Sequence, residues 1–338
     1  MKQLSQLYSL SGTFTLALRL VIGWTYFSAF WRRLVLENKL DPQTAGYIGE
    51  KFNHFLPNAL GIKPIIEYLV STPNVLFWAM IIFTLIEAIV GLSMILGFMT
   101  RLMSVGVFLL ATGILLGAGW LGTTCLDEWQ IGILGMASGF TLFFTGGGKY
   151  SLDTFLQNHF PATQSRLFSC LGSGVLPIEG KALQYITIWG TVIIFLMTLF
   201  TNQYFHNGVW GKLHNKSVKP VVEISDTRLN SHQLSFTVFR VEGVDVYGAF
   251  LIGIQLQDAA GHILINKDGQ ELSHFPKEDI DNYYLAQVKP GKHSLVIPLG
   301  GKAILTLKSH ELSSLKRGTY KLVLTDISGI KWSQSITY

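Results

Sequence analysis

The chain has 338 residues, of which 49% are hydrophobic and only 14% charged, a composition that indicates an integral membrane protein with a soluble part. Its net charge of +5 is modest and includes no dense block of Lys and Arg. This argues against a nucleic-acid partner and fits an anionic small substrate or lipid headgroups. Two cysteines, Cys125 and Cys170, form neither a CxxC motif nor a paired Cys/His spacing, so no zinc, iron–sulfur or c-type haem site is predicted.

Residues 12–34 are predicted to form the first membrane helix. The apolar run is too long for the core of a signal peptide and contains Arg19, so we expect an uncleaved helix. Gly23 would let a neighbouring helix approach closely. Aromatic residues gather toward the far end of the helix, as they do in the interfacial belt of a membrane protein.

Residues 35–75 are predicted to be a long loop with two short amphipathic helices. We expect these helices to lie on the membrane surface and to cap one mouth of the helix bundle. His54 lies in this loop. A single histidine is more often structural than catalytic, although this one would also be suited to carrying a proton.

The apolar stretch over residues 76–101 is predicted to be the second membrane helix, with Glu87 near its middle. A charged side chain at that depth costs about 2.5–3.5 kcal/mol on insertion scales. At helical spacing Glu87 shares a face with Arg101. One interpretation is a single buried ion pair that fixes helix packing. The interpretation that we prefer is a polar pocket inside the bundle, because Arg19 of the first helix is the natural partner for Glu87.

The third and fourth helices are predicted over residues 102–121 and 129–146. Both have glycine-rich faces that suit close packing in lipid, and a homodimer is a reasonable expectation. The short turn between these helices contains Cys125. Residues 146–153, GGGKYSLD, follow the fourth helix and lack the spacing of a phosphate-binding loop.

Residues 161–181 are predicted to be a linker, and residues 182–204 a fifth membrane helix. Over residues 208–338 the apolar residues alternate in short runs that are separated by turn residues. This pattern predicts an antiparallel β-sandwich, immunoglobulin-like in outline. Its strands carry no nucleophile–base pair and no metal-ligand cluster, so the sandwich is interpreted as a binding or covering module.

Three motifs resemble those of the DoxX/DoxD membrane family. They are LRLVIGW in the first helix, E-x3-G-x5-G-x2-TR from Glu87 to Arg101, and GGGKYSLD. The long loop, together with the appended helix and sandwich, narrows the resemblance to DoxD fused to a DoxA-like domain. DoxD and DoxA are subunits of thiosulfate:quinone oxidoreductase. The resemblance to DoxD covers residues 1–160, and the resemblance to DoxA, over residues 181–338, rests on architecture and position.

The resemblance implies that thiosulfate is oxidised to tetrathionate and that the electrons pass to a membrane quinone, ubiquinone or menaquinone, without a metal, flavin or haem. Guanidinium groups bind small dianions well, and Glu87 would serve as the proton source. The residues expected to bind thiosulfate are Arg19, Arg32, Arg33 and Arg101. Those expected to bind the quinone are Trp24, Tyr26, His54 and Trp78.

Cys125 is the candidate for covalent chemistry. Its thiolate would form an S–S bond to one thiosulfate, and a second thiosulfate would attack that bond and release tetrathionate. Nearby arginines would favour the thiolate. The alternative is that Cys125 is simply a small loop residue, and the sequence supports both interpretations equally.

The membrane orientation is predicted from the DoxA-like domain, which suggests an extracytoplasmic C-terminus in a prokaryotic cytoplasmic membrane. The loop at residues 35–75 and Cys125 would then also lie outside. Lys and Arg counts in the loops do not decide the orientation. Two other functions remain open: a non-enzymatic membrane scaffold for redox partners, and a small-anion carrier, which is disfavoured because paired inverted repeats are missing.

Overall fold

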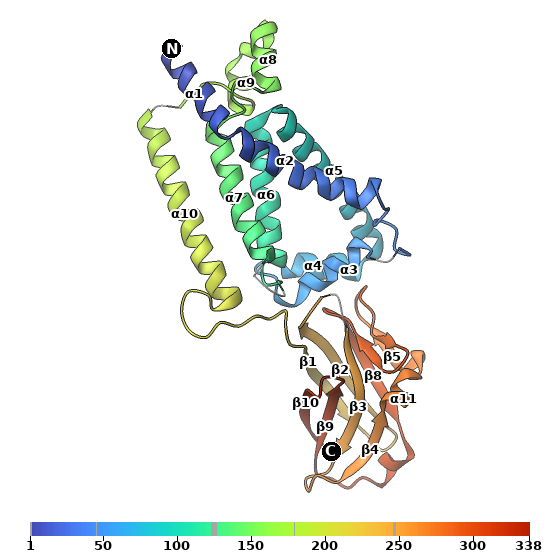
Figure 1. Ribbon diagram of the computed structural model, residues 1–338. Coiled ribbons are helices and arrows are strands. Elements are labelled where there is room, and N and C mark those ends of the chain that lie inside the picture. Colours follow the sequence, from blue (N-terminus) through green and yellow to red (C-terminus); the bar gives the residue numbers. More distant parts are fainter. Residues whose placement is uncertain (1, 45, 123–126, 179, 246–247) are drawn as a thin grey trace. The chain divides into compact units, whose positions relative to one another are not determined.

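The computed structural model describes residues 2–44, 46–122, 127–178, 180–245 and 248–338 (Figure 1). The chain forms two compact units. The first, here called the helical unit, comprises Met1–Ile48 and Phe77–His214. The second, here called the sandwich unit, comprises Gly49–Leu76 and Asn215–Tyr338. A large part of the predicted loop therefore belongs with the β-sandwich.

The helical unit begins with two helices, α1 (Lys2–Phe14) and α2 (Leu16–Phe30), and a π-helical turn, η1 (Trp31–Val35), continues α2. The axis bends by 52° between α1 and α2. At the bend the hydroxyl groups of Thr13 and Thr15 donate hydrogen bonds to carbonyl groups four residues earlier. Such bonds compete with the helical ladder and bend helices.

Four longer helices follow: α5 (Pro73–Leu96), α6 (Thr100–Ala118), α7 (Asp127–Thr145) and α10 (Gly180–His206). Among the described residues, α5, α6 and α10 are long and apolar enough to cross a membrane, and the bent pair α1–α2 is a fourth candidate. The helix α7 is not in this group, although it lies alongside α6 (Figure 1). The prediction of a membrane helical bundle is confirmed.

Glycines mark the places where these helices touch. A side chain at Gly23 would come within 3.0 Å of the carbonyl oxygen of Gly91, and one at Gly91 would overlap the backbone of Phe27. The close approach predicted at Gly23 is thus the crossing point of α2 and α5. In α7, Gly132, Gly135 and Gly139 face α6. These glycines are used within the chain, and the homodimer stays a prediction.

Two short helices, α8 (Leu152–His159) and α9 (Arg166–Leu171), with the 3-10 turn η3 (Pro161–Gln164), lie between α7 and α10. The glycine run before them forms a tight turn, because Gly146 and Gly148 have φ angles of 65° and 69°. Gly148 packs so closely on α1 that a side chain would overlap the α1 backbone.

The sandwich unit has two antiparallel sheets, with strand orders β1-β2-β8-β5 and β10-β9-β3-β7-β6, and β4 pairs with β3. The predicted all-β sandwich is confirmed. Its strands are β1 (Val221–Leu229), β2 (Gln233–Glu242), β3 (Ala249–Gln257), β4 (Ile263–Asp268), β5 (Ile280–Asn282), β6 (Lys289–Pro290), β7 (Leu295–Ile297), β8 (Lys302–Lys308), β9 (Thr319–Asp326) and β10 (Lys331–Thr337). Its short helical elements are α11 (Gly269–Ser273), η4 (Lys277–Asp279) and η5 (His310–Ser314).

Two helices from the predicted loop, α3 (Ile48–Phe55) and α4 (Lys63–Ser71), pack on this sandwich, with η2 (Leu56–Asn58) between them. The amide of Asn53, which is fully buried, donates to the carbonyl of Gly300 at 2.8 Å and accepts from the backbone N–H of Ala286 at 3.1 Å. Apolar side chains of this loop that were expected to face the membrane, Leu56, Ile66 and Val70, are instead buried in a cluster with Tyr284 of the sandwich.

Candidate functional site

A buried ion pair links α2 to α5 in the helical unit. Nη1 of Arg33 lies 2.5 Å from Oε2 of Glu87 and 3.0 Å from Oγ1 of Thr84, and it donates to both. Glu87 is only 4% exposed. Arg33 belongs to the π-helical turn that ends α2, a form of helix that is often found at functional sites. The same guanidinium lies over the ring of Phe83.

Two expectations about Glu87 were wrong. Its partner is Arg33 and not Arg19, which lies 14 residues earlier, or roughly 21 Å along the helix at 1.5 Å per residue. Arg101 does not share the face of Glu87, because α5 ends at Leu96 and the chain reverses at Gly97 before α6 begins. The sequence alone did not reveal this break in the apolar run.

A pocket of about 460 Å³ lies between the start of α5 and the chain that follows η1; we call it the Phe77 pocket. Leu34 of its wall directly follows Arg33, and Ile81 precedes Thr84 by three residues, nearly one helical turn. Its lining combines α5 with the chain just after α2: Leu34, Asn38, Leu40, Asp41, Pro42, Phe77 and Ile81. Sequence reasoning missed this pocket, because the residues after Leu34 show no periodic pattern.

A second buried polar cluster lies around Asp153, the last residue of GGGKYSLD. Its carboxylate accepts from the backbone N–H groups of Met99 and Thr100, at 2.7 and 3.0 Å, and from the hydroxyl groups of Thr100 and Ser173, both at 2.7 Å. A carboxylate at the N-terminus of α6 is favoured by the exposed N–H groups and the helix dipole. These hydrogen bonds join the GGGKYSLD motif, which contains Asp153, to the motif from Glu87 to Arg101, which contains Thr100.

Arg101 is held entirely by backbone carbonyls in this cluster. Its Nε donates to Phe143 at 3.0 Å, Nη2 to Gly174 at 2.5 Å, and Nη1 to Ser169. The side chain is fully buried. Arg101 thus ties α6 to the end of α7 and to the segment around α9.

Arg19 lies in the same region, is 2% exposed, and donates from Nη2 to the carbonyl of Tyr150 at 2.7 Å. Within the described part of the chain, its Nε and Nη1 have no hydrogen-bond partner. The guanidinium lies against Gly97, where any side chain would displace it.

The four arginines expected to bind thiosulfate therefore fall into two pairs at different ends of α2. Arg19 and Arg101 belong to the Asp153 cluster. Arg33 is paired with Glu87, and the neighbouring Arg32 is exposed, with its Nε donating to the carbonyl of Ser28 at 3.3 Å. One small anion cannot contact both pairs.

The four residues expected to bind quinone are not brought together. Tyr26 is buried and donates from its hydroxyl to the carbonyl of Val107 at 3.4 Å. Trp24 and Trp78 are 56% and 63% exposed on the outer surface of the helices. His54 belongs to the other unit.

His54 lies in a pocket of about 170 Å³ between α3 and the sandwich, where Glu50, Asp245 and Lys289 also line the wall. Burial lowers the pKa of His54 to about 4, against the opposing pull of Asp245. The imidazole is therefore neutral at neutral pH. Its Nδ1 is buried and has no hydrogen-bond partner among the described residues.

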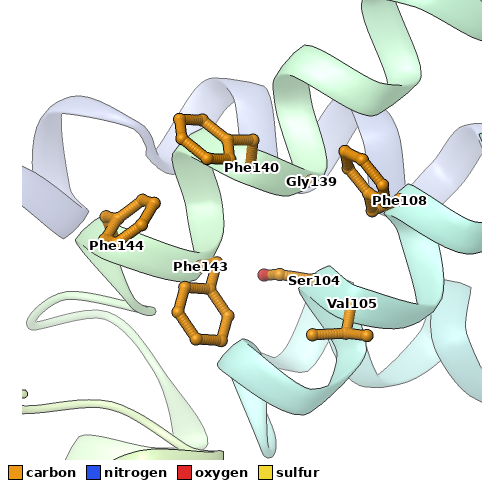
Figure 2. A pocket seen from close by; sticks show the side chains of 7 residues that line it. All are labelled: Ser104, Val105, Phe108, Gly139, Phe140, Phe143 and Phe144. Atoms are coloured by element: carbon orange, nitrogen blue, oxygen red, sulfur yellow. The ribbon is translucent and has the colours of Figure 1, made fainter. Parts of the chain in front are cut away.

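An apolar pocket of about 270 Å³, here called the Phe140 pocket, lies between α6 and α7. Figure 2 shows its phenylalanine rings around the hydroxyl of Ser104, which donates to the carbonyl of Thr100 at 2.7 Å. The complete lining is Ser104, Val105, Phe108, Gly139, Phe140, Phe143 and Phe144.

The candidate nucleophile, Cys125, lies outside the described residues. Cys170 of α9 is partly buried and has a free thiol. Among the described residues, no three His, Cys, Asp or Glu side chains are grouped so that they could hold a metal ion.

Comparison with protein families assigns the chain. The family described as TQO (thiosulfate:quinone oxidoreductase) small subunit DoxD matches residues 14–189, slightly more than half of the chain. This chain belongs to the DoxD family. The family described as TQO small subunit DoxA matches residues 205–335, which follow in N-to-C order. The chain is thus a DoxD–DoxA fusion, as its motifs predicted, and its family and apolar helices make it an integral membrane protein.

Proposed function

We propose that this protein is a thiosulfate:quinone oxidoreductase, a thiosulfate dehydrogenase that uses a membrane quinone as electron acceptor. Two thiosulfate ions, one quinone and two protons yield one tetrathionate and one quinol. The observation that carries the proposal is the presence of both TQO small-subunit families in one chain, in the order DoxD then DoxA.

Thiosulfate is proposed to bind at Arg32 and Arg33. Two consecutive guanidinium groups at the end of α2, one exposed and one oriented by Glu87, suit a small dianion. Arg19, roughly 20 Å away along α2, and Arg101 of α6 are assigned to the support of the Asp153 cluster.

The proposed chemistry uses Cys125. Its thiolate forms an S–S bond to the outer sulfur of one thiosulfate while two electrons pass to the quinone. A second thiosulfate attacks that outer sulfur, tetrathionate leaves, and the thiolate is restored. The reaction is electron-balanced because the quinone takes up the two electrons, together with two protons relayed by Glu87.

The sandwich is proposed to lie on the extracytoplasmic side. The segment from α3 to α4 must share that side, because Asn53 is hydrogen-bonded within the sandwich unit. Thiosulfate would then reach Arg32 and Arg33 from outside the cell.

The test compares Cys125→Ala with the matched variant Cys170→Ala in purified, lipid-reconstituted protein. Thiosulfate-dependent reduction of a soluble quinone analogue and tetrathionate formation are both measured. The proposal predicts that Cys125→Ala loses both and that Cys170→Ala keeps both. Full activity in Cys125→Ala would end the thiol mechanism, whereas no activity in the folded unmodified protein would favour a scaffold.

A further inference from the structure

We propose that the Phe77 pocket is the site where the quinone ring binds and that the Arg33–Glu87 pair is its source of charge and protons. The inference rests on the proposed function, since it names where the electron acceptor of that reaction lies. It differs from the expectation drawn from the sequence, which placed the quinone among Trp24, Tyr26, His54 and Trp78.

The size and lining of the pocket suit a quinone. Its volume of about 460 Å³ is within the roughly 300–1,000 Å³ that is typical of small-molecule sites. Leu40, Phe77 and Ile81 provide an apolar wall, and the Phe77 ring offers a surface for stacking. A thiosulfate dianion would gain nothing from such a wall.

The pocket also contains a hydrogen-bond donor for a quinone carbonyl. Oδ1 of Asn38 accepts from the backbone N–H of Leu40 at 3.2 Å, which fixes the orientation of the amide. Its Nδ2 donates to no described residue, so it remains available to a ligand. Asp41 is less suited to this role, since a carboxylate accepts hydrogen bonds and repels a carbonyl oxygen.

The Arg33–Glu87 pair does not line the pocket, but it is close to it along both elements. Leu34 of the lining directly follows Arg33, and Ile81 precedes Glu87 by six residues, roughly 9 Å of rise along α5. The guanidinium of Arg33 is hydrogen-bonded to Thr84 and Glu87. A fixed cation stabilises the negative charge that develops on a quinone oxygen when electrons arrive. The buried carboxylate of Glu87, on the same helix as Phe77 and Ile81, is the proposed relay for the two protons that complete the quinol.

The Phe140 pocket is the competing site, and its chemistry fits a quinone less well. Its lining has one polar side chain, Ser104, whose hydroxyl already donates to the carbonyl of Thr100. The lining lacks a charged group, so it offers neither a free hydrogen-bond donor for a quinone carbonyl nor a source of protons. An isoprenoid or acyl chain would fill this space.

The test fills each pocket in turn. Ile81→Trp narrows the Phe77 pocket, and the matched variant Val105→Trp narrows the Phe140 pocket. A photoreactive azido-ubiquinone is cross-linked to the full-length, lipid-reconstituted protein, and the labelled peptides are identified by mass spectrometry. We expect labelling at residues 34–42 and 77–81, loss of that label in Ile81→Trp, and an unchanged label in Val105→Trp. Labelling of α6 or α7, or none at either pocket, would overturn the inference.

A variant with a smaller structural change controls for misfolding of the tryptophan variants. Asn38 is exposed, so Asn38→Leu should leave the fold intact while it removes the Nδ2 group proposed to donate to the quinone carbonyl. Loss of one hydrogen bond predicts a rise of about tenfold in the KM for quinone, with the KM for thiosulfate unchanged. Specific labelling without turnover would refute the proposed function and leave the pocket assignment standing. Turnover with an unchanged KM for quinone in Asn38→Leu and in Ile81→Trp would refute the pocket and leave the function.

Discussion

Arg33 and Glu87 carry opposite charges into the helical unit, and each is the other's main partner. Breaking such a pair from one side leaves a buried charge and costs about 3–5 kcal/mol, whereas replacing both groups by apolar ones is often neutral. This asymmetry separates a structural role from a catalytic one.

Glu87→Gln is expected to lower quinone reduction by about 10²–10⁴-fold, the contribution of a positioned general acid. Because the same variant removes the negative charge that pairs with Arg33, it is compared with the double variant Arg33→Leu, Glu87→Leu. We expect the double variant to unfold thermally close to the unmodified protein and yet to stay inactive. Retained activity in the stable double variant would show that the pair only holds α2 to α5.

Arg101→Lys is expected to destabilise the helical unit strongly. A lysine ammonium cannot reach the three carbonyls that the guanidinium holds, and each unpaired buried carbonyl costs about 1–3 kcal/mol. Arg19→Lys is the matched control, because Arg19 holds one carbonyl. Thermal unfolding in detergent should show a much larger fall in Tm for Arg101→Lys, and equal falls would contradict the assignment.

His54 makes the stability of the sandwich unit depend on pH. Its folded pKa of about 4 is below its ordinary value of 6.5, so the unfolded chain binds more protons between these values. Stability is therefore lost as the pH falls from about 6.5 toward 4. The contribution reaches on the order of 2 kcal/mol at pH 5. Unfolding midpoints at pH 7.5 and 5 should differ less in His54→Phe than in the unmodified protein, and an equal difference would contradict the burial argument.

At the scale of elements, periodicity predicted most of the helices and long strands, since each has one apolar face. Strand β1 shows no regular alternation, because a bulge between Ser225 and Arg228, with Asp226 at a φ of 50°, interrupts it. The partner of Glu87 was missed, because which helix turns face each other depends on the reversal at Gly97 and the crossing at Gly23. A single sequence does not encode these contacts in any local pattern.

The membrane topology of the whole chain requires α7 to cross the membrane. The segment with α3 and α4 shares a side of the membrane with the sandwich, so an even number of crossings must separate them. The candidates α5, α6 and α10 make three. We infer that the fourth crossing is α7, which packs along α6.

At the scale of the whole molecule, this parity predicts a topology that surface labelling can check. Single cysteines at Lys51 and Lys292 in a cysteine-free background should react with an impermeant maleimide from the same side of the membrane. A cysteine at Lys149, which follows α7, should react only from the opposite side. With α5 and α6 crossing, labelling of Lys51 and Lys149 from the same side would show that α7 does not cross.

Thiosulfate should drive quinone reduction in this one chain. The most direct measurement is the stoichiometry of the purified protein in lipid: thiosulfate consumed, quinol formed and tetrathionate released. We expect two thiosulfates to be consumed for each quinol and each tetrathionate formed, and no quinol to form when thiosulfate is omitted. Quinone that stays oxidised in the presence of thiosulfate, in protein shown to be folded, would contradict this expectation.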